Sequence, residues 1–176
     1  MMKDILIGLS LLALAVGCGG GDKVASMDGE DLPEWFLNQP ELCGVGVQKV
    51  RGNIGSAKSF AEANARDDLS RQLETKVKSM IEQYNQEGGT EDGEISEELS
   101  TKAALSLSKQ TLQGSVPKKH SLKDGQFYSL VCLEPGALTK AIDQMKQLGA
   151  AQRRALQRRS DAAHKKLDEQ MAKYDQ

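Results

Sequence analysis

The stretch SAKSFAEANARDDLSRQLETKVKSMIEQY, residues 56–84, carries the strongest structural pattern of the chain. Its apolar residues recur at steps of three and four: Ala57, Ala61, Ala65, Leu69, Leu73, Val77, Met80 and Tyr84. This spacing predicts an amphipathic helix that ends near Gln86, and Ser56 or Ser59 is suited to cap its start. The alanines come first, so we expect the helix to begin close against a sheet and larger side chains to fill a wider gap further along.

A strand is predicted just before this helix, from Leu42 to Val50. Cys43, Val45 and Val47 alternate with Gly44, Gly46 and Gln48, which is the period of two of a strand. Glycines on one face indicate that a helix or another backbone segment packs closely there, or that the strand bends.

Two more strands are expected near residues 114–121 and 126–133, because Asp124-Gly125 between strand-like runs is a strong hairpin signal. A weaker helix is predicted over residues 96–112, with Leu99, Ala103 and Leu107 inward. A last helix is predicted from Ala137, with an inner stripe of Leu138, Ile142 and Met145. The sequence thus predicts an α+β fold in β-α-α-β-β-α order, with a three-stranded antiparallel sheet packed on the long helix and an extended C-terminal helix.

Beyond Gly149 the apolar positions thin to Leu156, Ala163, Leu167, Met171 and Tyr174. We therefore expect residues 149–176 to form a basic helical extension that projects from the domain or packs on a partner. On this interpretation the segment from Arg153 to Tyr174 is dispensable for folding.

The first residues are typical of an exported bacterial protein. Residues 5–16 are apolar and uncharged, but twelve helical residues reach only about 18 Å, too short to span a bilayer. This apolar run ends in Ala15-Val16-Gly17-Cys18, which resembles a lipobox. We therefore expect a signal peptide over residues 1–17 and a lipid on Cys18. A plain signal peptide with a chance cysteine is the alternative. Gly19, rather than Asp, follows Cys18, which favours the outer membrane.

Residues 18–32 have no apolar periodicity and are interpreted as a lipidated flexible tether. The folded domain is then expected over residues 33–148. Its first aromatic residues, Trp35 and Phe36, are expected to close one end of the core. The alternatives are that Trp35 lies in a ligand site, or that Trp35 and Phe36 form part of a surface that binds a partner.

The two remaining cysteines are predicted to lie in step with the inward sets of the first and last strands. Cys43 is in step with Val45 and Val47, and Cys132 with Tyr128 and Leu130. A Cys43–Cys132 disulfide, which an oxidising compartment permits, and two free core thiols both remain open.

Charge is segregated along the chain. Residues 84–101 hold six acids and no base, whereas residues 150–176 hold seven bases and four acids. Solvated segments are one interpretation. The other is that the basic helix meets anionic lipid, glycan phosphate or an envelope protein through Arg153, Arg154, Arg158 and Arg159. Nucleic acid is not an expected partner, because the chain is exported and no aromatic platform accompanies the bases.

No catalytic or metal-binding pattern is evident. The two histidines, His120 and His164, have no second histidine or cysteine at ligand spacing, and no Gly-x-Ser-x-Gly elbow occurs. We expect no enzyme activity, no metal and no cofactor.

Several marks together resemble the Lpp-twenty family of small bacterial outer-membrane lipoproteins, known chiefly as surface antigens. They are Pro33-x-Trp35, Gly44-Val45-Gly46, the ladder Ala57/Ala61/Ala65 leading into Arg66 and Leu69, and Asp124-Gly125 before Tyr128-Ser129-Leu130-Val131, within about residues 33–146. The resemblance implies a small antiparallel sheet curled around the long helix, and no catalytic residue.

The expected function is that of a non-catalytic outer-membrane lipoprotein of the bacterial envelope, facing the periplasm or the cell surface. It would act as a structural or protein-interaction module that binds other envelope proteins or itself. The alternatives are a periplasmic accessory factor for a cell-wall synthase or flagellar component, and a glycan- or lipid-binding module.

Overall fold

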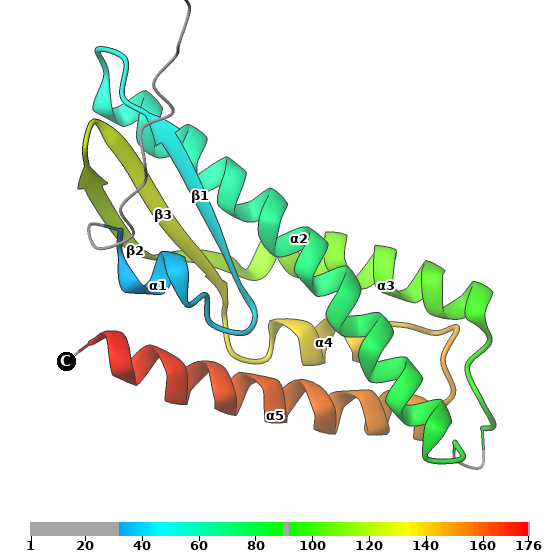
Figure 1. The fold of residues 1–176 in the computed structure, drawn as a ribbon. Helices are drawn as coiled ribbons and strands as arrows, with labels where there is room; N and C mark the ends of the chain where they lie inside the picture. Colours follow the sequence, from blue (N-terminus) through cyan, green and yellow to red (C-terminus); the bar gives the residue numbers. More distant parts are fainter. Residues whose placement is uncertain (1–31, 90–91, 176) are drawn as a thin grey trace, which may run out of the picture.

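The structure, a computed structural model, describes residues 32–89 and 92–175. In chain order the elements are α1 (Glu34–Leu37), β1 (Cys43–Lys49), α2 (Ile54–Gln86), α3 (Glu97–Thr111), a 3-10 turn (Leu112–Gly114), β2 (Ser115–Lys123), β3 (Gln126–Leu133), α4 (Ala137–Asp143) and α5 (Ala150–Tyr174). The predicted α+β class, with a small antiparallel sheet, a long helix and a C-terminal helix, is confirmed (Figure 1). The predicted signal peptide, Cys18 and the tether up to residue 31 lie outside the described residues.

The long helix α2 buries the predicted apolar stripe and ends at the predicted Gln86. Its start differs from the prediction. Asn53, not Ser56 or Ser59, is the N-cap, and its side-chain oxygen accepts hydrogen bonds from the backbone N–H groups of Gly55 and Ser56. An Asn in extended backbone is a strong cap, so the helix begins at Ile54, before either serine.

The sheet has the order β1-β3-β2, with both pairs antiparallel and β3 in the centre. Asp124 and Gly125, with φ of 50° and 68°, form the tight turn between β2 and β3. α2 packs against one face of this sheet. There a Cβ on Gly44 would fall 2.0 Å from the Ala65 carbonyl oxygen, and one on Gly46 would fall 2.1 Å from that of Ala61. The two glycines therefore allow the close helix contact that the sequence predicts.

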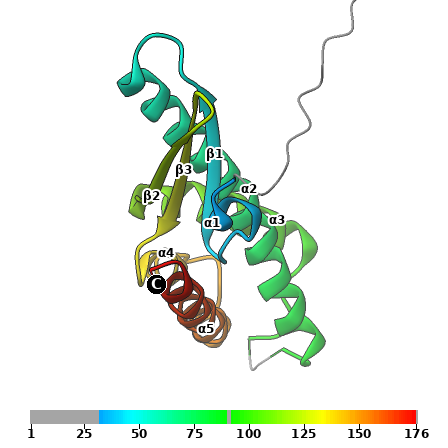
Figure 2. The same ribbon diagram turned by 60° about the vertical axis from the view of Figure 1, so that its left-hand side comes forward.

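The opposite face of the sheet carries Cys43, Val45 and Val47 from β1 and Tyr128, Leu130 and Cys132 from β3. The first helix, α1, covers part of this face, because the Phe36 ring meets the Tyr128 ring edge-on at 5.1 Å between centroids. The last turns of α5 reach it as well, since the Lys119 ammonium on β2 donates to the Tyr174 carbonyl oxygen. α2 thus covers one face of the sheet and α1 covers part of the other, while α5 lies across the end of the sheet (Figure 2).

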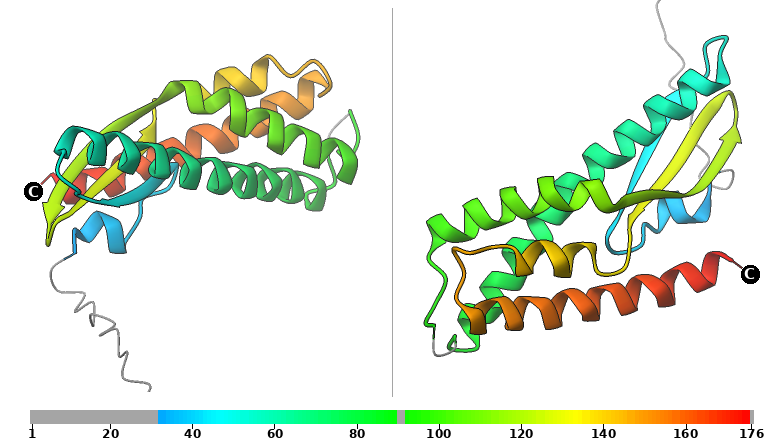
Figure 3. Two further views of the ribbon diagram at one scale, coloured as in Figure 1. Left: turned by 90° about the horizontal axis from the view of Figure 1, so that it is seen from above. Right: turned by 180° about the vertical axis from the view of Figure 1, so that it is seen from behind.

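The C-terminal segment does not project from the domain, and that expectation is wrong. The last helical region is divided into α4 and α5, and α5 runs back along the domain (Figure 3). Its residues Ala155, Leu156, Ala163 and Leu167 belong to the same buried cluster as Leu69 and Tyr84. Alanines let the helix approach closely, so a few large side chains complete the contact. Residues 149–175 are therefore part of the domain that was predicted to end at residue 148.

Described residues of the acidic segment after α2 contact the neighbouring helices. Asp92 accepts hydrogen bonds at the start of α5, and the Glu87 carboxylate pairs with the Arg159 guanidinium. Asn85 holds the far end of the segment, because its side chain both donates to and accepts from the backbone of Ile95. The described residues on either side of 90–91 are thereby attached to the helices beside them.

Candidate functional site

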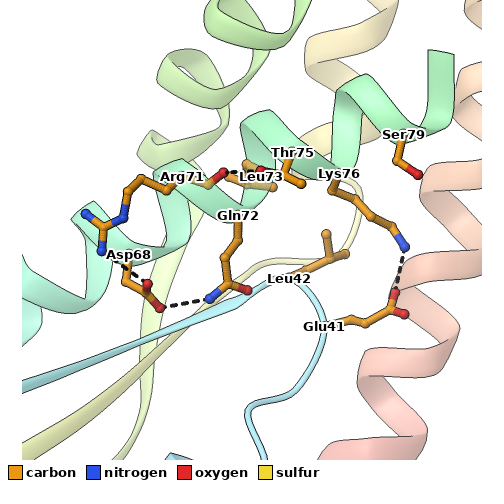
Figure 4. A pocket seen from close by; sticks show the side chains of 9 residues that line it. All are labelled: Glu41, Leu42, Asp68, Arg71, Gln72, Leu73, Thr75, Lys76 and Ser79. Atoms are coloured by element: carbon orange, nitrogen blue, oxygen red, sulfur yellow. Dashed lines mark hydrogen bonds and ion pairs between the residues drawn. The ribbon is translucent and has the colours of Figure 1, made fainter. Parts of the chain in front are cut away.

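A cleft of about 540 Å³ lies where the segment before β1 meets the middle of α2. Its apolar floor is Leu42 and Leu73, and its polar rim comes from both elements (Figure 4). The lining residues are Glu41, Leu42, Asp68, Arg71, Gln72, Leu73, Thr75, Lys76 and Ser79. A second hollow, of about 190 Å³, shares Glu41, Lys76 and Ser79 with the first and continues between α2 and α5.

Asp68 is the most heavily bonded side chain in the cleft. Its Oδ2 atom accepts from the Val45 backbone N–H at 3.1 Å, from the Gln39 amide at 2.9 Å and from the Gln72 amide at 2.8 Å. Arg71 pairs with the other oxygen at 3.2 Å. One turn earlier on α2, Asn64 donates to the Val47 carbonyl oxygen. Side chains of α2 therefore satisfy backbone groups along the outer edge of β1, which prevents another strand from pairing there.

Glu41 joins the same segment to α5. Its carboxylate lies 3.0 Å from the Lys76 ammonium on α2 and 3.4 Å from that of Lys166 on α5. Its backbone N–H donates to the Gln170 side chain at 2.7 Å. Partial burial raises the pKa of Glu41, but Lys76 and Lys166 together outweigh it, so the pKa lies below its usual value. An ionised carboxylate held between two ammonium groups is suited to fixing three elements and is a poor general acid.

Leu42, between Glu41 and the first strand, has a left-handed backbone with φ of 55° and a side chain that is 5% exposed. Such a backbone is costly for a leucine and persists only where the surroundings impose it. Here the Leu42 carbonyl oxygen accepts from the Leu133 N–H, and the side chain is buried in the core. The segment at the mouth of the cleft is therefore fixed in one conformation.

The structure joins Cys43 and Cys132 in a disulfide, the first of the two alternatives left open by the sequence. The two residues lie directly opposite each other on β1 and β3, with their Cα atoms 3.9 Å apart. Both are fully buried, on the face of the sheet that points away from α2.

The residues predicted to bind a partner have different environments. Trp35 is only 7% exposed and belongs to the core, whereas Phe36 is half-buried against Tyr128. Arg153 donates to the carbonyl oxygens of Met145 and Leu148, which fixes the turn between α4 and α5. Arg159 is occupied by Glu87. Arg154 and Arg158 are the two of the predicted arginines that are exposed, one turn apart on α5.

The two histidines also have different environments. His120 on β2 lies 3.0 Å from the Glu62 carboxylate on α2, so it takes part in packing the hairpin against the helix. His164 on α5 is 7% exposed, and neither ring nitrogen has a hydrogen-bond partner among the described residues. Burial lowers the pKa of His164, against the opposing effect of Asp168 and Asp161.

Sequence reasoning did not single out Glu41, Asp68, Lys76 or Lys166. Each looks like an ordinary charged surface residue, and the contacts that join them to other elements span 23 to 129 residues of the chain. In the part of the chain that the structure describes, no three His, Cys, Asp or Glu side chains are placed to share a metal ion. Nor is any helix of that part long and apolar enough to cross a membrane.

No protein-family model matches the chain, and no curated protein matches it.

Proposed function

We propose that the chain is an exported bacterial lipoprotein, anchored to the outer membrane through Cys18, whose domain is a non-catalytic structural or interaction module of the envelope. The observation that carries the proposal is the disulfide between Cys43 and Cys132. Structural disulfides belong to oxidising compartments such as the bacterial periplasm. The bridge supports export independently of the signal-peptide pattern, because it lies in the folded domain.

The charges in the cleft support a structural role. Asp68 and Glu41 are both engaged by neighbouring elements, and these contacts fix the entry to β1 between α2 and α5. A catalytic carboxylate needs a pKa near the working pH, whereas the pKa of Glu41 is lowered. The domain is thus built to hold one shape and present surfaces.

We further infer a relationship to the Lpp-twenty family. The marks that resemble the family have packing roles: Gly44 and Gly46 sit against Ala65 and Ala61, and Asp124-Gly125 makes the hairpin turn. The family resemblance implies the same non-catalytic role in the outer membrane.

The partner we propose is another envelope protein or a second copy of the chain. A periplasmic accessory role beside a cell-wall synthase or flagellar component is the alternative. The exposed pair Arg154 and Arg158 supports a glycan- or lipid-binding role as a second candidate, because both side chains lie on the outer side of α5.

Two measurements on the full chain test the proposal. Intact mass of the purified protein should show the acyl chains on a chain beginning at Cys18. Cys18→Ser should abolish them and release the protein from membranes that are washed with high salt, which screens surface charge. A wild-type chain without acyl mass would refute the anchor.

Chemical cross-linking in intact cells, followed by purification in detergent, should then capture an envelope protein or a dimer. The matched variants are Arg154→Glu with Arg158→Glu on α5, and Lys78→Glu on α2 as a control. If only the double arginine variant fails to capture the protein partner, the interface lies on α5. Capture of glycan alone would contradict the proposal that the partner is a protein.

A further inference from the structure

One end of the domain gathers three segments that are distant in the sequence. Lys49 at the end of β1 and Lys123 at the end of β2 both pair with Gln126 of β3, and the Val50 N–H donates to the Gly125 carbonyl oxygen at 2.8 Å. α2 begins a few residues later, at Ile54. We call this end the tip and define it as residues 49–54, Lys58 and residues 122–126. It lies at the opposite end of the domain from the start of α5 (Figures 1 and 2).

The tip exposes large apolar side chains. Ile54 and Leu122 are each 51% exposed. Phe60, about 9 Å further along α2 and outside the tip, is 61% exposed. These are three of the five exposed large apolar residues in the part of the chain that the structure describes. A small separate core of Ala57, Ala61 and Phe127 joins α2 to β3 near the tip. This core stabilises the tip, although Ile54 and Leu122 remain exposed to solvent.

The same end is basic. The tip contains one acid, Asp124, and four cations: Lys49, Arg51, Lys58 and Lys123. Among the described residues no ion pair joins Lys49, Arg51 or Lys123 to a carboxylate, and Lys58 lies 3.9 Å from Glu62. The tip therefore combines exposed apolar groups with cations whose charge is largely unbalanced.

We propose that the tip docks on a phosphate-bearing membrane surface. Ile54 and Leu122 enter the boundary between headgroups and acyl chains, and the surrounding lysines and Arg51 bind lipid phosphates. Charge complementarity favours an anionic occupant. The shape favours lipid over protein, because the tip is a narrow projecting end of the domain (Figure 1), whereas a stable protein interface needs roughly 800 Å² on each partner.

The position of the anchor agrees with this contact, and here the inference rests on the proposed function. The chain enters the domain at α1, whose Phe36 packs on Tyr128, two residues from Gln126 at the tip. A tether of about fourteen residues spans roughly 20 Å on average. A lipid on Cys18 would therefore hold the tip within reach of the membrane that carries the lipid.

The test uses a chain that cannot be lipidated, so its result does not depend on the anchor. Residues 18–176 carrying Cys18→Ser, produced under oxidising conditions, are sedimented with vesicles of phosphatidylglycerol and phosphatidylethanolamine or of phosphatidylcholine alone. Two variants alter the tip: Lys49→Glu with Lys123→Glu, and Ile54→Ser with Leu122→Ser. Two matched controls alter distant sites: Lys109→Glu on α3 with Lys140→Glu on α4, both exposed, and Leu105→Ser on α3, where Leu105 is 45% exposed.

We expect binding to the anionic vesicles that weakens as salt is added, and weak binding to phosphatidylcholine. The charge reversals at the tip should lower the partition coefficient at least about tenfold, since each surface cation contributes on the order of fivefold. The apolar variant should lower it as well, and both controls should bind like the parent chain. No binding by the parent chain, or equal losses in tip and control variants, would overturn the proposal, whether or not wild-type Cys18 proves to be acylated. Circular dichroism of each variant confirms that loss of binding is not loss of folding.

Discussion

The Asp92 carboxylate accepts a hydrogen bond from the Ala151 N–H at 2.7 Å, and this contact joins the acidic segment before α3 to the first turn of α5. The same oxygen lies 3.4 Å from the Gln152 N–H, and the Gln152 amide returns to the Asp92 and Gly93 carbonyl oxygens. An acid from 59 residues away thus acts as the cap of the C-terminal helix. Its negative charge also lies at the positive end of the helix dipole.

Replacing Asp92 with Ala should therefore destabilise the whole domain. Loss of a helix cap costs about 1 kcal/mol. Urea unfolding followed by circular dichroism measures the change. The control is Glu94→Ala, an exposed acid two residues away, which should leave the midpoint nearly unchanged. Equal effects of the two substitutions would mean that general charge, and not the cap, is responsible.

Truncation after Leu148 should unfold the domain or lower its melting temperature severely. The deletion removes Leu156 and Leu167, whose side chains are 1% and 4% exposed, and uncovers their partners in the core. Leu156→Ala is the milder form of the test and should cost about 2–5 kcal/mol. The exposed neighbour Arg154→Ala is its control. A truncated chain that melts like the full one would show that α5 does not belong to the core.

The long helix and the hairpin were predictable from sequence because their signals are local. The period of Ala57, Ala61 and Ala65 and the Asp124-Gly125 turn depend on neighbouring residues alone. The glycines at 44 and 46 indicated on which face of the first strand a close contact could form, and the structure shows that this contact is with α2. Each of these patterns remains visible when the rest of the chain is ignored.

The attachment of α5 and the cleft were not predictable in this way. Ala155 and Ala163 look like a thinning apolar stripe, yet alanine is the residue that permits close helix contact. The roles of Glu41 and Asp68 depend on where α2 and α5 lie relative to the chain before β1. An aspartate such as Asp92 becomes a cap only when the tertiary fold brings a distant helix start to it.

Ala61→Leu should overpack the contact between α2 and the sheet. Ala61 is fully buried and its carbonyl oxygen lies against Gly46, so the larger side chain must push the helix away. The expected cost is about 1–3 kcal/mol. Ala63→Leu, on the exposed side of the same helix, provides the control and should be neutral within about 0.5 kcal/mol. Unfolding curves that coincide would place the stripe against solvent.

Removing the disulfide should lower stability by roughly 4 kcal/mol on the chain-entropy account, because the bridge closes a loop of 89 residues. The variant Cys43→Ala with Cys132→Ala makes this measurable by urea unfolding. Thiol titration of the unfolded, unreduced Cys18→Ser chain gives a direct check and should find no free thiol. Two titratable thiols would show that the bridge does not form in the cell.

The last prediction concerns the buried imidazole of His164. Its pKa in the folded protein is lowered by burial, while in the unfolded chain it stays near 6.5. Above about pH 6.5 both states hold the ring neutral, and the full stability is present. As the pH falls below that value, the unfolded chain takes up a proton before the folded one does, so stability decreases until the lowered pKa is passed. Glu41, whose pKa is also lowered, loses its stabilising pairs only below about pH 4.5, so the two effects separate.

Urea midpoints measured between pH 7.5 and 5 should therefore fall in the wild-type protein, and His164→Gln should flatten that part of the profile. His120→Gln serves as the control, because His120 is partly exposed and lies 3.0 Å from the Glu62 carboxylate. The control should keep the loss of stability that His164 causes below pH 6.5. An unchanged slope in His164→Gln would mean that the ring finds a partner when protonated, with Asp161 and Asp168 on the same helix as the nearest candidates.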